Sequence, residues 1–413
     1  MDQLKGACIV GQSGGPTSVI NASVLGVVQA AMQSEAITQV FGAVNGISGV
    51  LEDRLIDFRT EDPGELEQLR YTPSSALGSC RYKLADPEVD DTDYRRILEV
   101  FRKYNVRYFF YNGGNDSMDT CNKVSAYLSK VGYECRVIGV PKTIDNDLVG
   151  TDHCPGYGSA AKFIATVCAE LRQDSQVYTT PTVNIVEIMG RHAGWLAGAA
   201  SLASVVGQGP DLIYLPERNF SMEEFLEDVD AVLKKQGFCV VAVSEGIHYA
   251  DGSFINQVEA AAADGFGHVQ LGGLGVYLAD VVKKRLGCKA RGIELSLLQR
   301  CAAHIASQTD IDESYDAGYY ALEKAVSGVS GVMIGFERNK NKADYRCEPV
   351  AVALDSVANA EKKVPLQWIN DRGNQVTQEF IDYALPLIQG ETKRQLVSSL
   401  PRYAKLKKVF TAK

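Results

Sequence analysis

The chain has 413 residues, of which 46% are hydrophobic and 23% charged, and its formal net charge is −9. This composition is ordinary for a soluble globular protein, and the length suffices for two or three domains, each with its own core. The acidic balance argues against a nucleic-acid-binding surface as the main function, although a local cationic pocket could still bind an anionic substrate.

The ten cysteines are scattered, without a CxxC pair or a Cys/His cluster. This spacing predicts neither a zinc site nor a disulfide framework, and we interpret the cysteines as reduced, mostly buried thiols. No N-terminal apolar segment of signal-peptide type occurs, and no stretch approaches the ~18 apolar residues of a membrane span. We expect a soluble, cytoplasmic protein with neither a membrane nor a nucleic acid as partner.

The first expected strand is residues 7–10 (ACIV), followed by the polar sequence GQSGGPT and a helix over residues 18–32. A strand, a glycine turn and a helix bring backbone N–H groups to face an anion. The alternative is a plain turn that needs glycine for its geometry, since the chain has neither GxGxxG here nor a Walker loop.

Two further polar segments follow along the chain. Residues 72–84 form a polar loop that carries Arg81 and Lys83. Residues 106–111 predict a second strand, followed by GGNDS and a helix that ends near residue 131. Asp116 in this second glycine turn could cap the helix or help to hold a metal-bound phosphate.

The central stretch is residues 141–150, PKTIDNDLVG, directly after the apolar run 135–140, which predicts a buried strand. In an extended segment, side chains two residues apart point the same way, so Asp145 and Asp147 are expected on one side, with Lys142 close by. Two carboxylates and an ammonium at a strand's carboxyl end suit proton abstraction and metal–phosphate chemistry. A polar turn is the alternative, because Asn, Asp and Gly are common turn residues.

The remaining pattern alternates strands with helices, which predicts α/β architecture with mostly parallel sheets. Strands are expected at 183–188, 238–244 and 332–336, and helices at 195–206, 222–236 and 271–286. The stretch 291–300 is expected to lead into another helix. After residue 346 the pattern loosens, and we expect an appended helical segment.

In combination these segments resemble the phosphofructokinase family, in its order and spacing, over residues 5–340. The segments are GQSGGPTSVINA near the start, LGSCR at 77–81, GGNDS at 113–117, PKTIDND at 141–147, EIMGR at 187–191, EG at 245–246 and LLQR at 297–300. The resemblance implies the phosphofructokinase fold, with two Rossmann-like domains. Residues 1–155 with 301–345 would form the phosphoryl-donor domain, 156–300 the sugar-phosphate domain, and 346–413 a C-terminal helical extension packed on both.

The resemblance also implies a reaction, the reversible transfer of a phosphoryl group to the 1-hydroxyl of fructose 6-phosphate, with Mg²⁺ as cofactor, in a homodimer or homotetramer. Asp145 would be the general base, and as an ordinary aspartate, with a pKa of ~3.9, it would be ionised at neutral pH. Asp116 and Asp147 would bind the metal.

The implied catalytic group is Asp145, Asp147, Lys142, Thr143 and Arg191. The implied sugar-phosphate site is Thr143, Asp145, Met189, Gly190, Arg191, Glu245, Arg291 and Arg300. The implied donor site is Gly15, Arg81, Gly114, Asp116 and Lys142.

The choice of phosphoryl donor depends on two positions. ATP enzymes of the family have glycine where this chain has Asp116, and usually glycine in place of Lys142, whereas the pyrophosphate enzymes resemble this chain at both. A carboxylate at position 116 would repel the α-phosphate of a nucleotide, and Lys142 supplies a point charge to compact pyrophosphate. Val44 also stands where ATP enzymes tend to have an aromatic that stacks on adenine. The resemblance therefore favours pyrophosphate.

Three residues depart from the family pattern. Asn115 replaces an aspartate, and Leu297 replaces a polar residue that helps to bind the 6-phosphate. Thr182 replaces an arginine that, in many members, reaches across a subunit interface. The last two leave the 6-phosphate contacts open, and cations of the C-terminal part could replace them. An ATP-dependent phosphofructokinase and a non-catalytic sugar-phosphate sensor remain alternatives, as does sedoheptulose 7-phosphate as the sugar.

Overall fold

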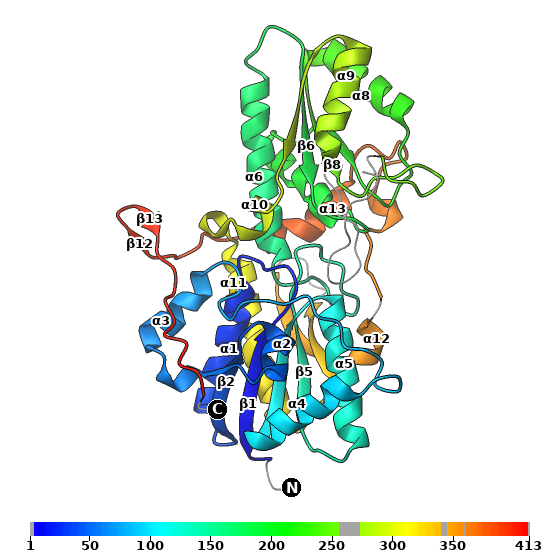
Figure 1. The fold of residues 1–413 in the computed structure, drawn as a ribbon. Helices are drawn as coiled ribbons and strands as arrows, with labels where there is room; N and C mark the ends of the chain where they lie inside the picture. The colour runs from blue at the N-terminus through cyan, green and yellow to red at the C-terminus, as the bar shows by residue number, and fades with distance from the viewer. Residues whose placement is uncertain (1–3, 256–272, 340–344, 359, 412–413) are drawn as a thin grey trace.

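The computed structural model describes residues 4–255, 273–339, 345–358 and 360–411. It consists of two α/β halves, one above the other in Figure 1, each built on its own sheet. The expectation of α/β architecture with mostly parallel sheets is confirmed.

The first half contains a seven-stranded sheet with the order β11-β10-β5-β4-β1-β2-β3. The five inner strands are parallel, and the edge strands β3 and β11 are antiparallel to their neighbours. The strands are β1 (Gly6–Gln12), β2 (Ile37–Ala43), β3 (Leu55–Asp57), β4 (Val106–Gly113), β5 (Arg136–Pro141), β10 (Val332–Arg338) and β11 (Cys347–Ala353).

Helices cover both faces of this sheet, so its inner strands are apolar throughout. In β1, Ile9 packs with α4 and α5 on one face, while Val10 packs with α1 and α11 on the other. The helices are α1 (Ile20–Gln33), α2 (Gly46–Leu51), α3 (Pro63–Gln68), α4 (Thr92–Lys103), α5 (Asn115–Lys130) and α11 (Gln308–Val326). Two short 3-10 helices lie at Phe58–Thr60 and Leu69–Tyr71.

The second half contains a parallel four-stranded sheet with the order β7-β8-β6-β9. The strands are β6 (Thr182–Ile188), β7 (Leu212–Tyr214), β8 (Phe238–Ser244) and β9 (Lys289–Glu294). The helices are α6 (Tyr157–Ser175), α7 (Trp195–Ala199), α8 (Met222–Gln236), α9 (Leu274–Leu286) and α10 (Leu298–Cys301), with 3-10 helices at Ala200–Val206 and Ala303–Ile305. The expected start of α9 at residue 271 lies outside the described residues.

Two helices, α6 and α11, connect the halves (Figure 1). They meet at a buried carboxylate, because Asp310 of α11 accepts hydrogen bonds at 2.9 Å from the backbone N–H groups of Gly156 and Ser159, at the start of α6. A carboxylate is favourable there because the helix N-terminus carries a partial positive charge. The carboxyl ends of β5, β6 and β8 thereby face one another across the junction of the halves.

The part after residue 346 differs from the expected helical extension. Its first residues form β11, the edge strand of the first sheet, and only short helices follow: α12 (Leu354–Val357), α13 (Gln378–Ala384) and the 3-10 helices Leu366–Trp368 and Leu385–Ile388. A projecting hairpin comes next, made of β12 (Leu396–Val397) and β13 (Leu400–Pro401), and the chain then runs extended beside α3 to residue 411 (Figure 1). The difference arises because CEPVAVA alternates between half-buried and exposed positions, which suits an edge strand.

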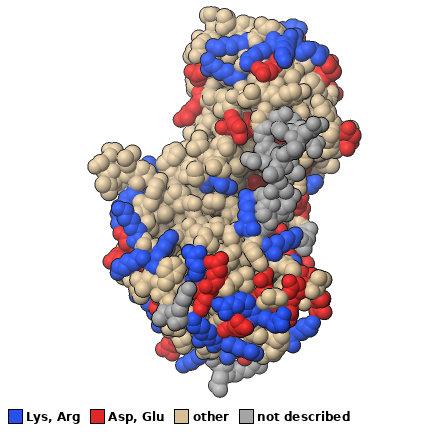
Figure 2. Space-filling view, in the orientation of Figure 1, with Lys and Arg blue, Asp and Glu red and all other residues tan. Residues whose placement is uncertain are grey.

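Positive and negative side chains are interspersed over the face shown in Figure 2 and form no large surface of one sign there. Within the described part of the chain, no helix is long and apolar enough to cross a bilayer.

Candidate active site

The candidate site lies where the turn after β5 meets the second half. Thr143, Asp145 and Asp147 are partly exposed, whereas the intervening Ile144 and Asn146 are buried. This alternation puts the two carboxylates on one side, as the sequence predicts, although Asn146 has a left-handed backbone (φ 55°) rather than an extended one. Asp145 is held by a hydrogen bond from its backbone N–H to Thr143 Oγ1 at 3.1 Å.

The Asp145 carboxylate is not an ordinary one. Burial, followed by the negative charges of Asp147 and Glu245, raises its pKa to about 7, and Lys142 and Arg191 offset only part of this effect. The expectation of a fully ionised side chain at neutral pH therefore does not hold for the site without ligands. Such a pKa is well matched to a general base that works near neutrality.

Lys142 connects two turns: the turn of residues 143–147 after β5, which we call the aspartate turn, and the first glycine turn, residues 11–17. Its side chain is 3% exposed, and Nζ donates to the carbonyl oxygen of Gly15 at 2.6 Å. Burial lowers the pKa of Lys142 to about 8, and the charge that compensates most for this effect is that of Asp145. The ammonium therefore remains mostly protonated at neutral pH, next to both carboxylates.

Two arginines add positive charge on the same side. The turn residue Gly15 lies so close to Arg300 that a Cβ on the glycine would be 2.9 Å from a guanidinium nitrogen. The loop that carries Arg81 packs on the same turn, since Gly14 N–H donates to Cys80 O at 3.1 Å and Ser79 Oγ to Gly14 O at 2.6 Å. The charges of Arg300 and Arg81 both act to lower the pKa of Lys142. The glycine turn and the 77–81 loop, far apart in sequence, thus form one cationic group.

The second half contributes the loop after β6 and the end of β8. Gly190 N–H donates to Glu245 Oε1 at 3.3 Å, and burial raises the pKa of Glu245 to about 7. Gly190 has φ 134°, which requires glycine, and a Cβ on Gly246 would lie 1.9 Å from Arg191 O. These glycines let the two loops interlock, with the charge of Arg191 acting on both Asp145 and Glu245.

The residues beside Asp147 fit a magnesium ion. Asn115 Nδ2 donates to Asp147 Oδ2 at 3.3 Å, while Asn115 Oδ1 is buried without a hydrogen-bond partner. An unsatisfied amide oxygen beside carboxylates supplies the hard oxygen ligands that Mg²⁺ prefers. The sequence predicts Asp116 as a metal ligand with Asp147, and the structure adds Asn115 as the residue that hydrogen-bonds to Asp147.

The other predicted site residues lie at the start of α5 and on strand β9. Asp116 lies in the first turn of α5, and its side chain makes no hydrogen bond or ion pair within the described residues. Gly114 directly precedes α5, and a Cβ there would come no closer than 3.6 Å to Lys142 O. Arg291 is exposed on the edge strand β9, and Leu297, directly before α10, is 53% exposed.

Some residues that shape the site were not predicted. Gln299 is buried and accepts a hydrogen bond from Met189 N–H at 3.2 Å, which holds the loop after β6. Glu361 and Lys362, from the C-terminal part, both affect the pKa of Asp147, which burial raises overall. Only the tertiary fold brings residue 361 to residue 147, so no local sequence pattern could indicate it.

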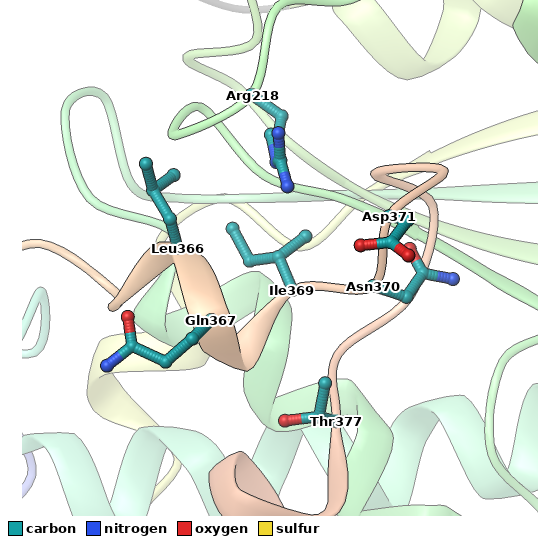
Figure 3. Close-up of a pocket in the computed structure, with 7 residues that line it drawn as sticks. All are labelled: Arg218, Leu366, Gln367, Ile369, Asn370, Asp371 and Thr377. Carbon is teal, nitrogen blue, oxygen red and sulfur yellow. The ribbon is translucent and has the colours of Figure 1, made fainter.

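A surface pocket of about 580 Å³ lies elsewhere in the second half (Figure 3). It contains none of the predicted site residues and no pair of carboxylates. Its lining residues are Arg218, Leu366, Gln367, Ile369, Asn370, Asp371 and Thr377. The chemistry therefore places the candidate active site at the strand ends and not in this pocket.

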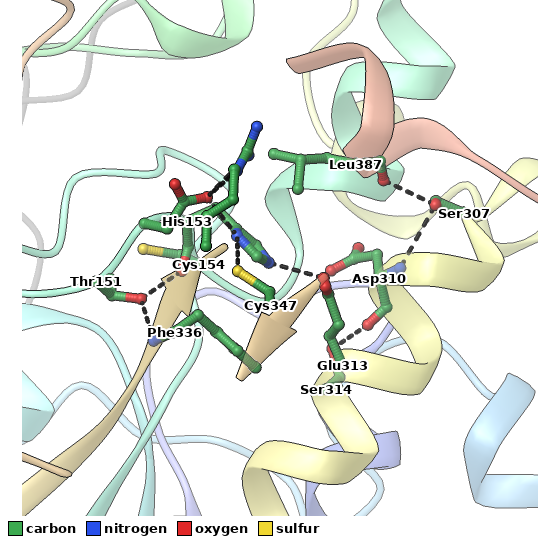
Figure 4. A network of polar contacts seen from close by, with 12 residues as sticks. Thr151, His153, Cys154, Ser307, Asp310, Glu313, Ser314, Phe336, Cys347 and Leu387 are labelled. Atoms are coloured by element: carbon green, nitrogen blue, oxygen red, sulfur yellow. Dashed lines mark hydrogen bonds and ion pairs between the residues drawn. The ribbon is translucent and has the colours of Figure 1, made fainter. Parts of the chain in front are cut away.

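A buried ionic network surrounds His153 (Figure 4). Its ring nitrogens lie 3.0 Å from Asp152 Oδ1 and 2.8 Å from Glu313 Oε2, and Arg338 donates to the same Asp152 oxygen at 2.8 Å. Cys347 Sγ is 4.0 Å from His153 Nδ1, so Asp152, His153 and Cys347 have the composition of a metal site. The two carboxylates are already neutralised by the imidazolium and the guanidinium, however, and we interpret the network as structural.

Comparison with known proteins gives one family. The family model described as Phosphofructokinase matches residues 7–294. The pyrophosphate–fructose 6-phosphate 1-phosphotransferase of Methylococcus capsulatus is 45% identical over 406 residues, which cover 97% of this chain and 96% of that protein. The protein of the same name from Halomonas elongata is 45% identical over 404 residues, covering 96% and 95%.

A solved structure agrees with these relatives. The crystal structure of a pyrophosphate-dependent phosphofructokinase from Nitrosospira multiformis is 42% identical and superimposes with a TM-score of 0.90. The superposition covers 99% of this chain and 98% of that one, so the similarity extends through the C-terminal part as well as both halves.

Proposed function

The chain belongs to the phosphofructokinase family, and we propose that it transfers a phosphoryl group reversibly from pyrophosphate to the 1-hydroxyl of fructose 6-phosphate. The products are fructose 1,6-bisphosphate and orthophosphate. The observation that carries the proposal is the setting of the Asp145 carboxylate, on which Lys142 of the first half and Arg191 of the second both act electrostatically.

In the proposed step, Asp145 accepts the proton of the sugar's 1-hydroxyl group. At the same time, the oxygen of that hydroxyl forms a bond to the nearer phosphorus of pyrophosphate. The bond between that phosphorus and the bridging oxygen breaks, and the bridging oxygen leaves with orthophosphate. Since phosphoryl transfer depends mainly on positioning and charge neutralisation, Lys142, Arg81 and Arg300 would neutralise the donor. Gly15 and Gly114 would let their backbone approach it closely, while Thr143 would hold the transferring group.

The sugar phosphate would bind to the second half. Met189, Gly190 and Arg191 follow the end of β6, Glu245 follows the end of β8, and both Arg191 and Glu245 act electrostatically on the Asp145 carboxylate. Arg300, whose guanidinium lies beside Gly15, would contact the sugar phosphate as well as the donor, while Arg291 on the exposed edge of β9 would reach the 6-phosphate only from the rim.

Magnesium, when bound, would neutralise charge on the phosphates. Asp147 and the free amide oxygen of Asn115 would hold it, with Asp116 as a further carboxylate at the start of α5. We further propose that the first half is the donor domain and the second half the sugar-phosphate domain, in a cytoplasmic homodimer or homotetramer.

Turnover measurements with alternative substrates test the proposal. The full-length protein is assayed with Mg²⁺ and fructose 6-phosphate, with pyrophosphate and ATP as donors side by side, and then with sedoheptulose 7-phosphate as acceptor. We expect pyrophosphate-dependent formation of fructose 1,6-bisphosphate and at least a hundredfold lower rate with ATP. Faster turnover with ATP would identify an ATP enzyme, and sugar-phosphate binding without turnover a sensor; either result would overturn the proposal.

A further inference from the structure

A short C-terminal segment, residues 361–364, connects the two sides of the candidate site; we call it the strap. The backbone N–H of Lys362 donates to Asp147 O at 2.7 Å, and its carbonyl accepts from Trp195 Nε1 at 2.9 Å. Val364 N–H donates to Glu217 Oε1 at 2.9 Å. Lys362 and Val364 thus bond to the aspartate turn of the first half and to the start of α7 and the loop after β7 in the second.

The Lys362 side chain is directed at the loop after β5, where it contacts residues 146, 151 and 152. Its Nζ donates to Asp152 O at 2.7 Å, to Thr151 O at 3.2 Å and to Asn146 Oδ1 at 3.4 Å. An ammonium has three N–H donors, so all of them are used within the protein. Lys362 therefore has no donor left for a phosphate.

Asn146, which Lys362 contacts, determines how the two aspartates point. It has a left-handed backbone, and its side chain is bonded at both ends: Nδ2 donates to Tyr383 Oη at 2.8 Å, and Oδ1 accepts from Cys154 N–H at 2.9 Å. A non-glycine residue in this conformation must be held by its surroundings. Two of its contacts, Lys362 and Tyr383, come from the C-terminal part.

The other end of the strap holds the loop that follows Arg191. Glu361 Oε1 lies 2.9 Å from His192 Nδ1, and Glu217 Oε1, which binds the strap, also accepts from Gly194 N–H at 2.8 Å. The residues next to Arg191 and the residue next to Asp145 are therefore attached to the same four-residue segment.

We propose that Lys362 is a positioning residue for phosphoryl transfer and that the strap sets the position of Asp145 and Asp147 relative to the Arg191 loop. This inference rests on the proposed function. Misplacing reacting groups by about 1 Å costs on the order of 10²-fold in rate. Lys362 would thus affect the chemical step without contacting either substrate.

The test compares Lys362→Met with Lys284→Met, an exposed lysine of α9 outside the strap, in the full-length protein. For Lys362→Met we expect kcat to fall about 10²-fold, with the KM for fructose 6-phosphate almost unchanged. More Mg²⁺ should be needed for half-maximal rate, because Asn146, next to Asp147, loses the ammonium that contacts it. Lys284→Met should keep wild-type kinetics.

A second variant keeps the inference testable if Lys362→Met does not fold. Trp195→Phe removes the indole donor to Lys362 O and part of the ring over which the Lys362 ammonium lies at 5.2 Å, and it keeps an aromatic ring in the core. It should lower kcat severalfold at an unchanged KM for fructose 6-phosphate. A melting temperature close to that of wild type would show that the loss is not due to unfolding.

Three results would overturn the inference. Wild-type kcat in both folded variants would show that the strap does not affect the chemical step. A rise in the KM for fructose 6-phosphate as the main effect would make Lys362 a substrate ligand instead. Absence of turnover by the wild-type protein would overturn the proposed function and this inference with it, whereas the first two results leave the proposed function intact.

Discussion

At the scale of single residues, Asp145 shows how function and stability oppose each other. Because its pKa is raised to about 7 in the folded protein, folding favours the protonated form. The sign follows from linkage: stability is lost as pH rises from the unfolded value of ~3.9 through the folded value, and the loss is complete above about pH 7. A carboxylate suited to be the base therefore weakens the fold that holds it.

Asp145→Asn should lower kcat by at least ~10²–10⁴-fold, since the base is removed. The same variant should melt at a higher temperature than wild type at pH 8 and by a smaller margin at pH 5, because no poorly solvated carboxylate has to ionise. Kinetics and thermal melting at both pH values check this, with the exposed Asp382→Asn as control. A variant with a tenth of wild-type activity, or one no more stable at pH 8, would contradict the assignment.

Donor choice is also a matter of individual residues. Asp116→Gly should weaken the use of pyrophosphate and admit some ATP, and more so with Lys142→Gly, since a carboxylate that repels the α-phosphate and a cation for pyrophosphate are both lost. The effects need not add, because both residues would contact one donor. The ratio of kcat/KM for the two donors is the measurement, with Asp119→Gly on the same helix as control. An unchanged ratio in the double variant would refute the charge argument.

At the scale of elements, the sequence predicted those strands that consist of buried apolar runs. Buried apolar runs coincide with strands β1, β4, β5, β6, β8 and β10. Ser221 is the N-cap of α8, and its side chain accepts a hydrogen bond from Glu224 N–H, as in a capping box. The edge strand β9, with the sequence KARGIE, was missed, because a polar edge strand has no apolar run. At the site, the aspartate turn and its glycine-turn partner were predicted, but the strap was not, since its contacts span more than 200 residues of sequence.

Helix α1 also bears on regulation. Leu25 and Gln29 stand where regulated bacterial ATP enzymes of the family carry arginines for an effector. Leu25 is fully buried, while Gln29 bonds to Glu67 at 3.0 Å and to Tyr315 at 2.7 Å. Neither can supply the charge-assisted hydrogen bonds that an anionic effector needs.

We therefore expect hyperbolic kinetics in fructose 6-phosphate, with no marked response to millimolar ADP or phosphoenolpyruvate. Initial rates over a range of substrate concentrations, with and without each ligand, are the measurement. A sigmoidal curve that either ligand shifts would reveal an effector site elsewhere on the molecule.

At the scale of the whole molecule, the His153 network joins distant parts of the chain: the loop after β5, α11 and β10. Burial lowers the pKa of His153, but Glu313 and Asp152 outweigh it and raise the pKa well above its ordinary value. A raised imidazole pKa contributes stability that is complete below the unfolded value of ~6.5 and lost as pH rises through the folded value.

The urea midpoint should therefore fall as pH rises above about 6.5. His153→Gln should lower stability by about 3–5 kcal/mol at neutral pH, because two buried carboxylates lose a partner, and it should flatten the pH dependence. The exposed His304→Gln should follow wild type. An equally steep pH dependence in His153→Gln would show that another group is responsible.

The strand order of the first sheet has a consequence for how the protein is made. Strand β5 pairs on one side with β4 but on the other with β10, which the ribosome adds only after the whole second half. At ~5–20 residues per second, that side of β5 waits roughly 10–40 s for its partner. During this interval the nascent chain has an apolar sheet with an open edge, the kind of surface that aggregates or recruits chaperones. A chain stopped at residue 331 should accordingly sediment as aggregate, whereas the full-length chain stays in the supernatant, because only translation of the last strands closes the edge.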